Sequence, residues 1–387
     1  NGTYSGVMSG AGGFTLTAGT LTLSGANTYS GGTTINGGSL VITNASALGS
    51  GASLTLSNGN YANNQNFVGQ QPVNGLDMSP IAVGWLVTGS GVNTTVVSVS
   101  APSYVNGWVN YTFTLGVSSN FGTTLVFSAP APSVTVNSGG LLSIGSGITV
   151  ANPVVSNGGS IQFGSGTNAI SSNVTLNAAT TISAPSGSQS ISGVISGTGY
   201  GVTIGGSGTV VLTGAGNTAL GANTLTLSNA NGTYSGVMSG TGGLTLTAGT
   251  LTLSGANTYT GTTTINGGTL TVNGSLSDST SVAVASGATY ALGASDTIAA
   301  LTGAGSVNLN SYTLTLGNAT GTYSGVMSGT GGLTLTAGTL TLSGANTYTG
   351  TTTINGGTLT VNGSLSDSTS VAVASGATYA LGASDTI

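Results

Sequence analysis

Short runs in which apolar and small polar residues alternate recur along most of the chain. Leu244–Leu246, Leu314–Leu316 and residues 251–253 each place Leu at every second position with Thr between. A period of two is that of a β-strand with one buried face. Gly-Gly, Asn-Gly and Ser-Gly pairs, which favour turns, separate the runs. The helix-forming residues Glu, Lys and Arg are absent. The pattern therefore predicts an all-β protein of short strands and tight turns.

Long sequence repeats indicate how these strands are arranged. Residues 232–298 and 321–387 are identical, and the offset between them is 89 residues. Residues 2–40 form a third copy with five changes, and residues 192–218 form a more divergent fourth. Repeats of this size are typical of solenoids. We therefore predict a right-handed parallel β-helix, or β-solenoid, with coils of about 20 residues and about four coils per repeat. Because copies occur at both ends of the sequence, we also expect further repeats in a longer protein.

One segment departs from this pattern. Residues 61–132 contain both tryptophans, four of six phenylalanines and five of seven prolines. We therefore predict a β-solenoid over residues 1–60, an inserted β module over residues 61–132, and a β-solenoid over residues 133–387. Trp85, Trp108 and Tyr104 are candidates for a ligand-binding platform in that module. The interpretation that we favour is that such aromatic residues form the core of the module.

The phrase GANTYTGTTTINGGTL, at residues 255–270, returns unchanged at residues 344–359 and nearly unchanged at residues 25–40. It resembles the autotransporter-associated β-strand repeat, whose pattern is G-x-N-T-Y-T-G-x-T-T-I-x-x-G-T-L. The resemblance implies a parallel β-helix outside a bacterial cell or on its surface, as in adhesins and matrix proteins. Within the phrase we interpret the following positions as structural: Asn257, Tyr259, Ile265, Asn266, Gly267 and Gly268, with Asn346, Tyr348, Ile354 and Asn355 in the later copy.

Two side-chain arrangements are expected from this repeat. Asn257, Asn266 and their equivalents are predicted to form amide ladders between coils. Thr-x-Thr pairs are predicted to face outward, as on ice-binding β-helices. Thr245 and Thr250 are too close in sequence to stack on one face, however. We therefore favour the interpretation that Thr is simply a good exposed strand residue.

The charge content excludes several classes of function. The five charged side chains are all aspartates: Asp77, Asp278, Asp296, Asp367 and Asp385. The absence of Lys and Arg argues against nucleic-acid binding, which depends on phosphate neutralisation. The absence of Cys excludes disulfides and thiolate metal sites. No apolar run approaches the roughly 18 residues of a membrane-spanning helix, and no signal peptide is visible.

The same composition leaves little chemistry for catalysis. Glycan-cleaving β-helices use paired carboxylates or basic residues, and Glu, His, Lys and Arg are absent here. Asp278 and Asp296 would be neighbours on adjacent coils, but a turn-capping role is the favoured interpretation. We therefore predict no enzyme activity, catalytic residue, metal site or cofactor.

Neutrality suggests a structural function instead. Proteins usually protect exposed strand edges with charge and keep their net charge away from zero. Our hypothesis is an extracellular filament or matrix protein, as in a biofilm, whose stacked neutral repeats self-associate end to end or laterally. The alternative is an adhesin stalk that presents a carbohydrate- or surface-binding module at residues 61–132. A surface polysaccharide is then a second candidate partner besides the chain itself.

Overall fold

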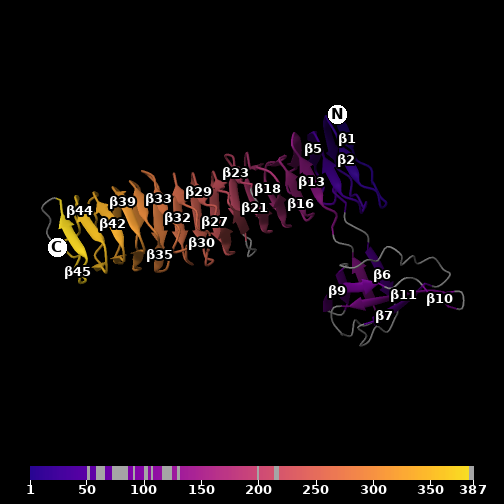
Figure 1. Ribbon diagram of the computed structural model, residues 1–387. Helices are drawn as coiled ribbons and strands as arrows, with labels where there is room; N and C mark the ends of the chain where they lie inside the picture. Colours follow the sequence, from indigo (N-terminus) through magenta and orange to yellow (C-terminus); the bar gives the residue numbers. More distant parts are fainter. Residues whose placement is uncertain are drawn as a thin grey trace.

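The computed structural model describes residues 1–49, 131–197, 200–212 and 218–382, and the backbone of seven strands between residues 53 and 128. These residues form strands and no helix, and most of the strands stack into a rod of successive coils (Figure 1). The prediction of an all-β parallel solenoid is therefore confirmed. The described residues contain no helix with the length and apolar character needed to cross a bilayer.

Each coil of the rod passes through three faces in turn. Face 1 is a 16-stranded parallel sheet with strand order β1 (Gly2–Tyr4), β3 (Thr20–Leu23), β5 (Gly38–Ile42), β14 (Gly140–Ile144), β17 (Ser160–Phe163), β20 (Thr180–Ser183), β23 (Val202–Gly205), β26 (Leu225–Leu227), β29 (Leu244–Leu246), β31 (Thr263–Ile265), β33 (Val282–Val284), β36 (Leu301–Gly303), β39 (Ala319–Tyr323), β42 (Gly338–Leu342), β44 (Thr358–Val361) and β46 (Thr378–Leu381).

Face 2 is a ten-stranded sheet. Its strands are β15 (Thr149–Val150), β18 (Thr167–Ile170), β21 (Ser188–Ile191), β24 (Thr209–Leu212), β27 (Ala230–Tyr234), β30 (Gly249–Leu253), β32 (Thr269–Val272), β34 (Thr289–Leu292), β37 (Ser306–Asn308) and β40 (Val326–Ser328).

Face 3 consists of two sheets. The first contains β2 (Phe14–Leu16), β4 (Thr33–Ile35), β13 (Val134–Asn137), β16 (Val154–Asn157), β19 (Val174–Leu176), β22 (Ile195–Gly197), β25 (Thr218–Gly221) and β28 (Met238–Gly240). The second contains β35 (Asp296–Ile298), β38 (Leu314–Leu316), β41 (Leu333–Leu335), β43 (Thr352–Ile354) and β45 (Val371–Val373). Between the two sheets, backbone hydrogen bonds from Thr258 to Met238 and from Asn257 to Ser275 continue the stack.

The core is built from columns of identical or similar side chains. Leu246 of β29 pairs with Ile265 of β31, which pairs with Val284 of β33, and all three are fully buried. These partners are 19 residues apart, so one coil has about that length. Each such buried side chain contributes about 1.5–3 kcal/mol to stability. The alternation seen in the sequence thus places its apolar half inside the rod.

Glycine at the corners lets successive coils approach closely. Gly268 has a φ of +76°, and a Cβ there would lie 2.1 Å from the carbonyl oxygen of Gly249. Gly249 itself has a φ of +94°. Both conditions exclude a side chain, because an L-residue at this φ is strained and the added carbon has no room. The Gly-Gly pair at the end of the repeated phrase is therefore required by the corner.

The segment between β5 and β14 leaves the solenoid stacking unbroken. Gly38 of β5 pairs directly with Gly140 of β14, and Thr33 of β4 pairs with Val134 of β13. The intervening strands form a separate antiparallel sheet of order β10-β11-β9-β8-β12-β6, with β7 on β11. Their bounds are β6 (Ser53–Ser57), β7 (Asn66–Gln71), β8 (Leu86–Gly89), β9 (Val92–Val99), β10 (Ser103–Val105), β11 (Trp108–Leu115) and β12 (Thr124–Ser128). In Figure 1 this sheet lies beside the end of the rod that holds the N-terminus.

The sequence repeat and the coil are out of phase. In the first identical copy, β29 lies on face 1 and β30 on face 2. The same residues in the second copy form β41 on face 3 and β42 on face 1. From β29 the chain returns to face 1 four times, at β31, β33, β36 and β39, before it reaches β41. One repeat of 89 residues therefore makes four and two-thirds turns. The expectation of about four coils per repeat was wrong, because a coil of 19 residues does not divide the repeat evenly.

Candidate functional site

Asn257 ties three coils together from inside the rod. Its Oδ1 accepts a hydrogen bond from the backbone N–H of Met238 on the preceding coil, at 2.9 Å. Its Nδ2 donates to the carbonyl of Gly255 at 2.9 Å and to that of Ser275, on the following coil, at 3.1 Å. The side chain is buried. Asn257 therefore binds backbone groups rather than other amides, and the ladder predicted at this position is wrong.

The second copy repeats this arrangement. Asn346 accepts from the N–H of Met327 at 3.0 Å and donates to the carbonyls of Gly344 and Ser364 at 3.0 and 3.1 Å. The two sites lie on different faces, since the chain turns through an extra two-thirds of a coil between them. Asn27, in the partial copy at residues 2–40, likewise accepts a hydrogen bond from the backbone N–H of Met8 and donates to the carbonyl of Ala47.

The other singled-out residues of the phrase are also placed for structure. Tyr259 and Tyr348 are fully buried, with their hydroxyls 2.6 and 2.5 Å from the Oγ1 atoms of Thr263 and Thr352. Ile265 and Ile354 are fully buried, whereas Asn266 and Asn355 are exposed. Gly267 precedes the corner at Gly268, and a Cβ on Gly267 would lie 2.5 Å from the carbonyl oxygen of Thr247. The buried tyrosines and isoleucines and the corner glycines of the phrase thus contribute to the coil itself.

Amide ladders do occur, at other positions. Asn137 donates to Asn36 at 2.6 Å, Asn157 donates to Asn137 at 2.6 Å, and Asn177 donates to Asn157 at 2.9 Å. Asn36, in the partial copy at residues 2–40, is the equivalent of Asn266. Asn36 is thus part of an amide ladder, but its partners lie outside the phrase, and Asn266 and Asn355 form no such ladder in the described part of the chain. The continuation through residues 137–177 could not be predicted, because the spacing of these residues is set by the coils around the insertion.

Sequence analysis also missed a buried amide pair. The Nδ2 of Asn168 donates to the Oε1 of Gln189 at 2.8 Å, and both side chains are buried on neighbouring strands of face 2. Gln189 also donates to backbone carbonyls, the closest being that of Ser186 at 2.7 Å. This pair satisfies polar groups inside the rod. The available sequence signal was an amide at a strand position that carries Val on the next coil, and it is a weak one.

Asp296 is a buried carboxylate between two coils. It is 5% exposed, and its two oxygens accept the backbone N–H of Leu276, on the preceding coil, at 3.3 and 3.2 Å. The hydroxyl of Tyr290 donates to its Oδ2 at 3.4 Å. This geometry joins coils rather than capping a turn. The turn-capping role expected for Asp296 is therefore wrong, because the strand β35 turns its side chain inward.

Burial changes the acidity of this cluster. The pKa of Asp296 is raised to about 6, mainly by desolvation and to a smaller extent by the nearby charge of Asp278, against the lowering effect of the hydrogen bonds. Desolvation, with the neighbouring carboxylate of Asp296, also raises the pKa of Tyr290 and of Tyr259 above the usual tyrosine range. The carboxyl group of Asp296 thus stays protonated up to mildly acidic pH, but it is buried between coils.

The remaining aspartates are scattered. Asp278 and Asp367 are exposed and belong to different copies of the repeat. Asp77 and Asp385 lie outside the described residues. Within the described part of the chain, no three acidic, His or Cys residues converge where a metal ion could be held.

The aromatic candidates of the inserted segment fall largely outside the description. Trp85 is not among the described residues, and for Trp108 and Tyr104 the backbone alone is described. Tyr104 pairs with Val109, and Trp108 pairs with Val105, in the antiparallel strands β10 and β11. Their role as a binding platform stays a prediction.

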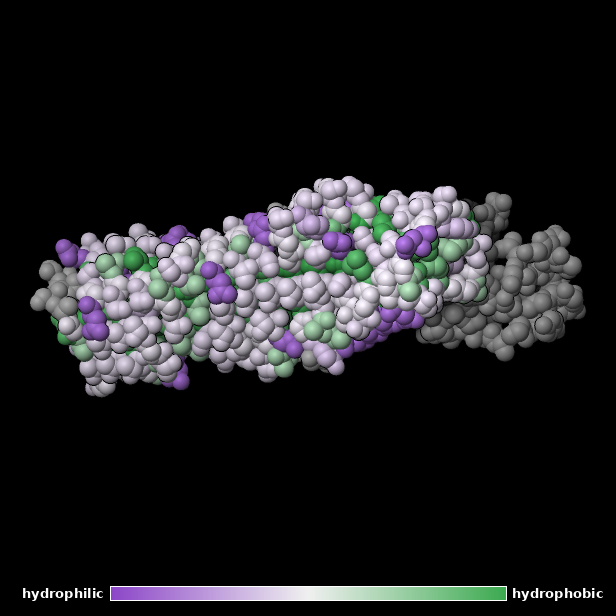
Figure 2. Space-filling model, turned by 90° about the horizontal axis from the view of Figure 1, so that it is seen from above, coloured by the Kyte–Doolittle hydropathy of each residue, from purple (hydrophilic) through white to green (hydrophobic). Residues whose placement is uncertain are grey.

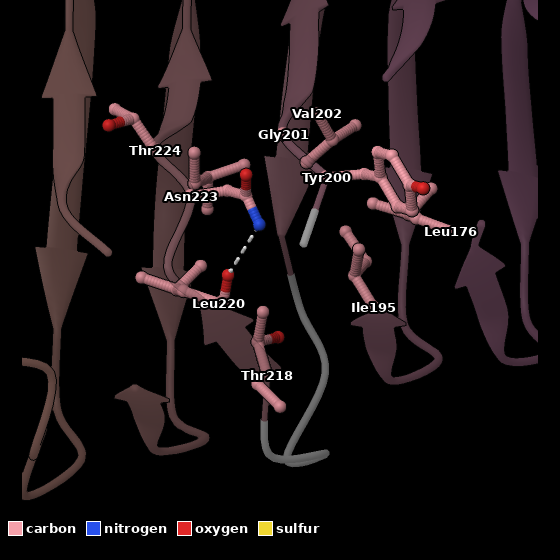
Figure 3. Close-up of a pocket in the computed structure, with 11 residues that line it drawn as sticks. Leu176, Ile195, Tyr200, Gly201, Val202, Thr218, Leu220, Asn223 and Thr224 are labelled. Carbon is pink, nitrogen blue, oxygen red and sulfur yellow. Dashed lines mark hydrogen bonds between the residues drawn. The ribbon is translucent and has the colours of Figure 1, made fainter. Parts of the chain in front are cut away.

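A small pocket opens on the rod around β23 (Figure 3). Its floor includes Leu176, Ile195 and Leu220, and the ring of Tyr200, which is 44% exposed, lies at one side. The amide of Asn223 is turned back to donate to the carbonyl of Leu220 at 3.2 Å. The lining offers apolar surface and no acid or base for catalysis.

The Thr-x-Thr pairs stack as separate outward columns on each face. Thr245 of β29 pairs with Thr226 and Thr264 on face 1. Thr250 of β30 pairs with Thr269 on face 2. Thr245 and Thr250 thus lie on different faces, as their sequence spacing predicted. Each nevertheless belongs to a column that continues from coil to coil.

Comparison with known proteins identifies the repeat. The family model described as the passenger-associated-transport-repeat matches residues 18–42, 237–272 and 337–361. These three matches include the Gly-rich corner and the strands on either side of it. Among curated proteins and among solved structures, nothing matches the chain.

Proposed function

Because the chain is an autotransporter-associated β-strand repeat protein, of the passenger type found outside bacterial cells, we propose that it is a structural component of an extracellular filament or matrix. In this proposal, copies of the chain associate with one another and need no cofactor. The observation that carries the proposal is the nearly uncharged outer surface of a regular parallel solenoid. Of the side chains described, only Asp278 and Asp367 place a charge in an exposed position.

The scarcity of charge on the surface favours self-association. Identical rods normally repel one another through their net charge, which keeps proteins soluble and monomeric. Figure 2 shows a face of mostly intermediate hydropathy, with strongly hydrophilic residues at scattered places and hydrophobic stretches along the rod. The outward strand positions are largely Thr, Ser and Ala, whose short side chains need little ordering on contact. Two such rods therefore meet little electrostatic or entropic opposition.

A non-enzymatic role is part of the same proposal. The chain has no Glu, His, Lys, Arg or Cys to act as base or nucleophile. The one carboxyl group described with a raised pKa, that of Asp296, is enclosed between coils. We expect purified protein to leave bacterial and plant polysaccharides uncleaved.

Electron microscopy and light scattering of the purified chain test the proposal. We expect filaments or bundles whose mass increases with protein concentration, and little change between low and high salt, because few charges are available to be screened. Monodisperse monomers at high concentration would rule the proposal out.

An adhesin stalk is the second candidate, and the inserted segment favours it. The direct pairing of β5 with β14 shows that the solenoid tolerates this antiparallel sheet without interruption. A rod that carries such an appendage resembles a spacer that presents a binding module, with a surface polysaccharide as the candidate ligand. Deleting residues 50–130 separates the two functions. A stalk would lose attachment to cells or glycan surfaces, whereas a filament would still assemble.

A further inference from the structure

Each identical copy of the repeat contains two exposed Asn-Gly pairs. The first pair directly follows the strand β31 or β43, and the second directly follows β32 or β44. All four asparagines are exposed. The two kinds of pair therefore have the same chemistry and similar access to water. We call them the early pairs, Asn266-Gly267 and Asn355-Gly356, and the late pairs, Asn273-Gly274 and Asn362-Gly363.

A backbone hydrogen bond distinguishes the late pairs from the early ones. The N–H of Gly274 donates to the carbonyl of Leu253 at 3.1 Å, and the late pair of the second copy makes the equivalent bond at 3.1 Å. Within the part of the chain that the structure describes, the N–H groups of Gly267 and Gly356 donate no hydrogen bond. The difference recurs in both copies, although they lie on different faces. It is therefore a property of the repeat and not of one place on the rod.

The side-chain amides of the early pairs are also free. Among the described residues, Asn266 and Asn355 make no side-chain hydrogen bond. Asn36 and Asn157 also precede glycine, but their amides are held in the ladder between neighbouring coils. The early pairs thus combine an unheld side-chain amide with an unbonded backbone nitrogen on the next residue.

We propose that Asn266 and Asn355 are sites of spontaneous deamidation, in which the backbone nitrogen of the following glycine is the nucleophile. The nitrogen of Gly267 attacks Cγ of Asn266 and forms a C–N bond. The bond from Cγ to Nδ2 then breaks, and ammonia leaves with the proton that the glycine nitrogen gives up. Water opens the resulting cyclic imide at either carbonyl, which gives aspartate or isoaspartate. Glycine favours the attack because it has no side chain beside the nitrogen.

Each conversion adds a negative charge to a nearly neutral rod, because the new carboxyl group is ionised at neutral pH. Conversion of both residues adds two charges to the five that the chain carries. One new charge follows β31 on face 1 and the other follows β43 on face 3. The consequence for assembly rests on the proposed self-association: charge on two faces restores repulsion between identical rods. An aged chain should therefore assemble less than a fresh one.

Peptide mapping of the full chain after incubation at neutral pH tests the modification. Chymotrypsin cleaves after Tyr and Leu, so residues 260–270 carry the early asparagine and residues 271–276 carry the late one. The second copy yields the same two peptides, and each signal therefore sums both copies. We expect mass spectrometry to show faster conversion of the early peptide, on the order of fivefold, the factor that one net hydrogen bond contributes. In urea both peptides should convert at similar rates, because the hydrogen bond that protects the late pair is lost.

Equal rates in the folded chain, or faster conversion of the late peptide, would overturn the inference whether or not the chain assembles. Light scattering of aged samples tests the consequence with N266Q/N355Q and the matched control N273Q/N362Q, after circular dichroism has shown that both are folded. We expect N266Q/N355Q to keep its assembled mass, while the control and the unmodified chain lose theirs. An equal loss in all three would overturn the effect on assembly. A chain that converts at the early pairs but never assembles would instead reject the proposed function.

Discussion

The two identical copies of the repeat differ in where they lie and hardly at all in how they are built. Asn257 and Asn346 make the same three hydrogen bonds, with lengths that agree within 0.1 Å, on different faces of the rod. Thr280 donates to the carbonyl of Tyr259 at 2.6 Å, and Thr369 donates to that of Tyr348 at 2.5 Å. The faces are therefore structurally equivalent, and local contacts between neighbouring coils determine the fold.

Burial is the property that does differ between the copies. Leu292 of β34 is fully buried, while its equivalent Leu381 of β46 is 51% exposed. Val284 is fully buried, and its equivalent Val373 is 47% exposed. In the first copy, β36 and β37 cover these positions, whereas β46 and β45 are the last described strands of their sheets. The same sequence thus forms a core only where another coil stacks upon it, as expected of a quasi-one-dimensional fold.

The largest expected effect comes from core truncation at matched positions. Leu251 and Leu340 are both fully buried, on faces 2 and 1 respectively. We expect Leu251→Ala and Leu340→Ala each to lower the free energy of unfolding by about 3 kcal/mol, because each leaves a cavity in a packed column. Urea denaturation measures both. Costs that differ by more than about 1 kcal/mol, when coupling to neighbours is small, would show that the faces are not equivalent.

Removal of the Asn that links three coils should cost somewhat less. Asn257→Ala and Asn346→Ala each leave a buried methionine N–H without its acceptor, and we expect a loss of about 2 kcal/mol in both copies. Asn266→Ala, at an exposed position of the same phrase, provides the control and should change stability by less than about 0.5 kcal/mol. Equal losses for all three variants would contradict the role assigned to the buried amides.

Much of this architecture could be predicted from the sequence, because the information is local. The alternation of Leu and Thr predicted the strands, and the paired glycines predicted the corners. The open-ended repeat indicated a solenoid rather than a barrel. The phase of the repeat could not be predicted in this way. The error of taking 20 residues per coil instead of 19 accumulates over the 89 residues of a repeat. The extra two-thirds of a turn, which places β41 on another face than its equivalent β29, was therefore not predicted.

The candidate sites were harder to predict than the fold. Asn257 was correctly singled out as structural, but its partners are backbone groups of coils 18 and 19 residues away, which no local pattern specifies. Asp296 looked like a turn residue because Ser and Gly precede it within four positions. Its burial depends on the strand β35 forming on face 3, where it pairs with β38 of the following coil.

The pH dependence of stability tests the burial of Asp296, near the end of the first identical copy. Asp296 has its pKa raised to about 6 in the folded chain, against about 3.9 when unfolded. Between pH 4 and pH 6 the native state holds a proton that the unfolded state has lost, so stability falls as the pH rises through this window. We expect a loss on the order of 1–2 kcal/mol, measured by urea denaturation at pH 4 and pH 7.

Substitution assigns this dependence to one residue. Asp296→Asn should remove most of the difference between pH 4 and pH 7, whereas Asp278→Asn, at an exposed position, should leave most of it. The same measurement on Asp385→Asn gives the contribution of the equivalent residue in the second copy to the pH dependence. A pH profile that Asp296→Asn leaves unchanged would show that the buried carboxyl does not titrate in this range.

The smallest expected effect is at the outward columns. Thr264 and Thr353 are equivalent positions on faces 1 and 3, and both are half-buried. Thr264→Val and Thr353→Val keep the β-branched shape and remove the hydroxyl, so each should change the free energy of unfolding by less than about 0.5 kcal/mol. Thermal unfolding of the two variants in parallel measures this. A decrease of more than about 1 kcal/mol in the free energy of unfolding in one copy alone would mean that the hydroxyl has a structural partner on that face. The faces would then be equivalent in their buried contacts but not in their outward side chains.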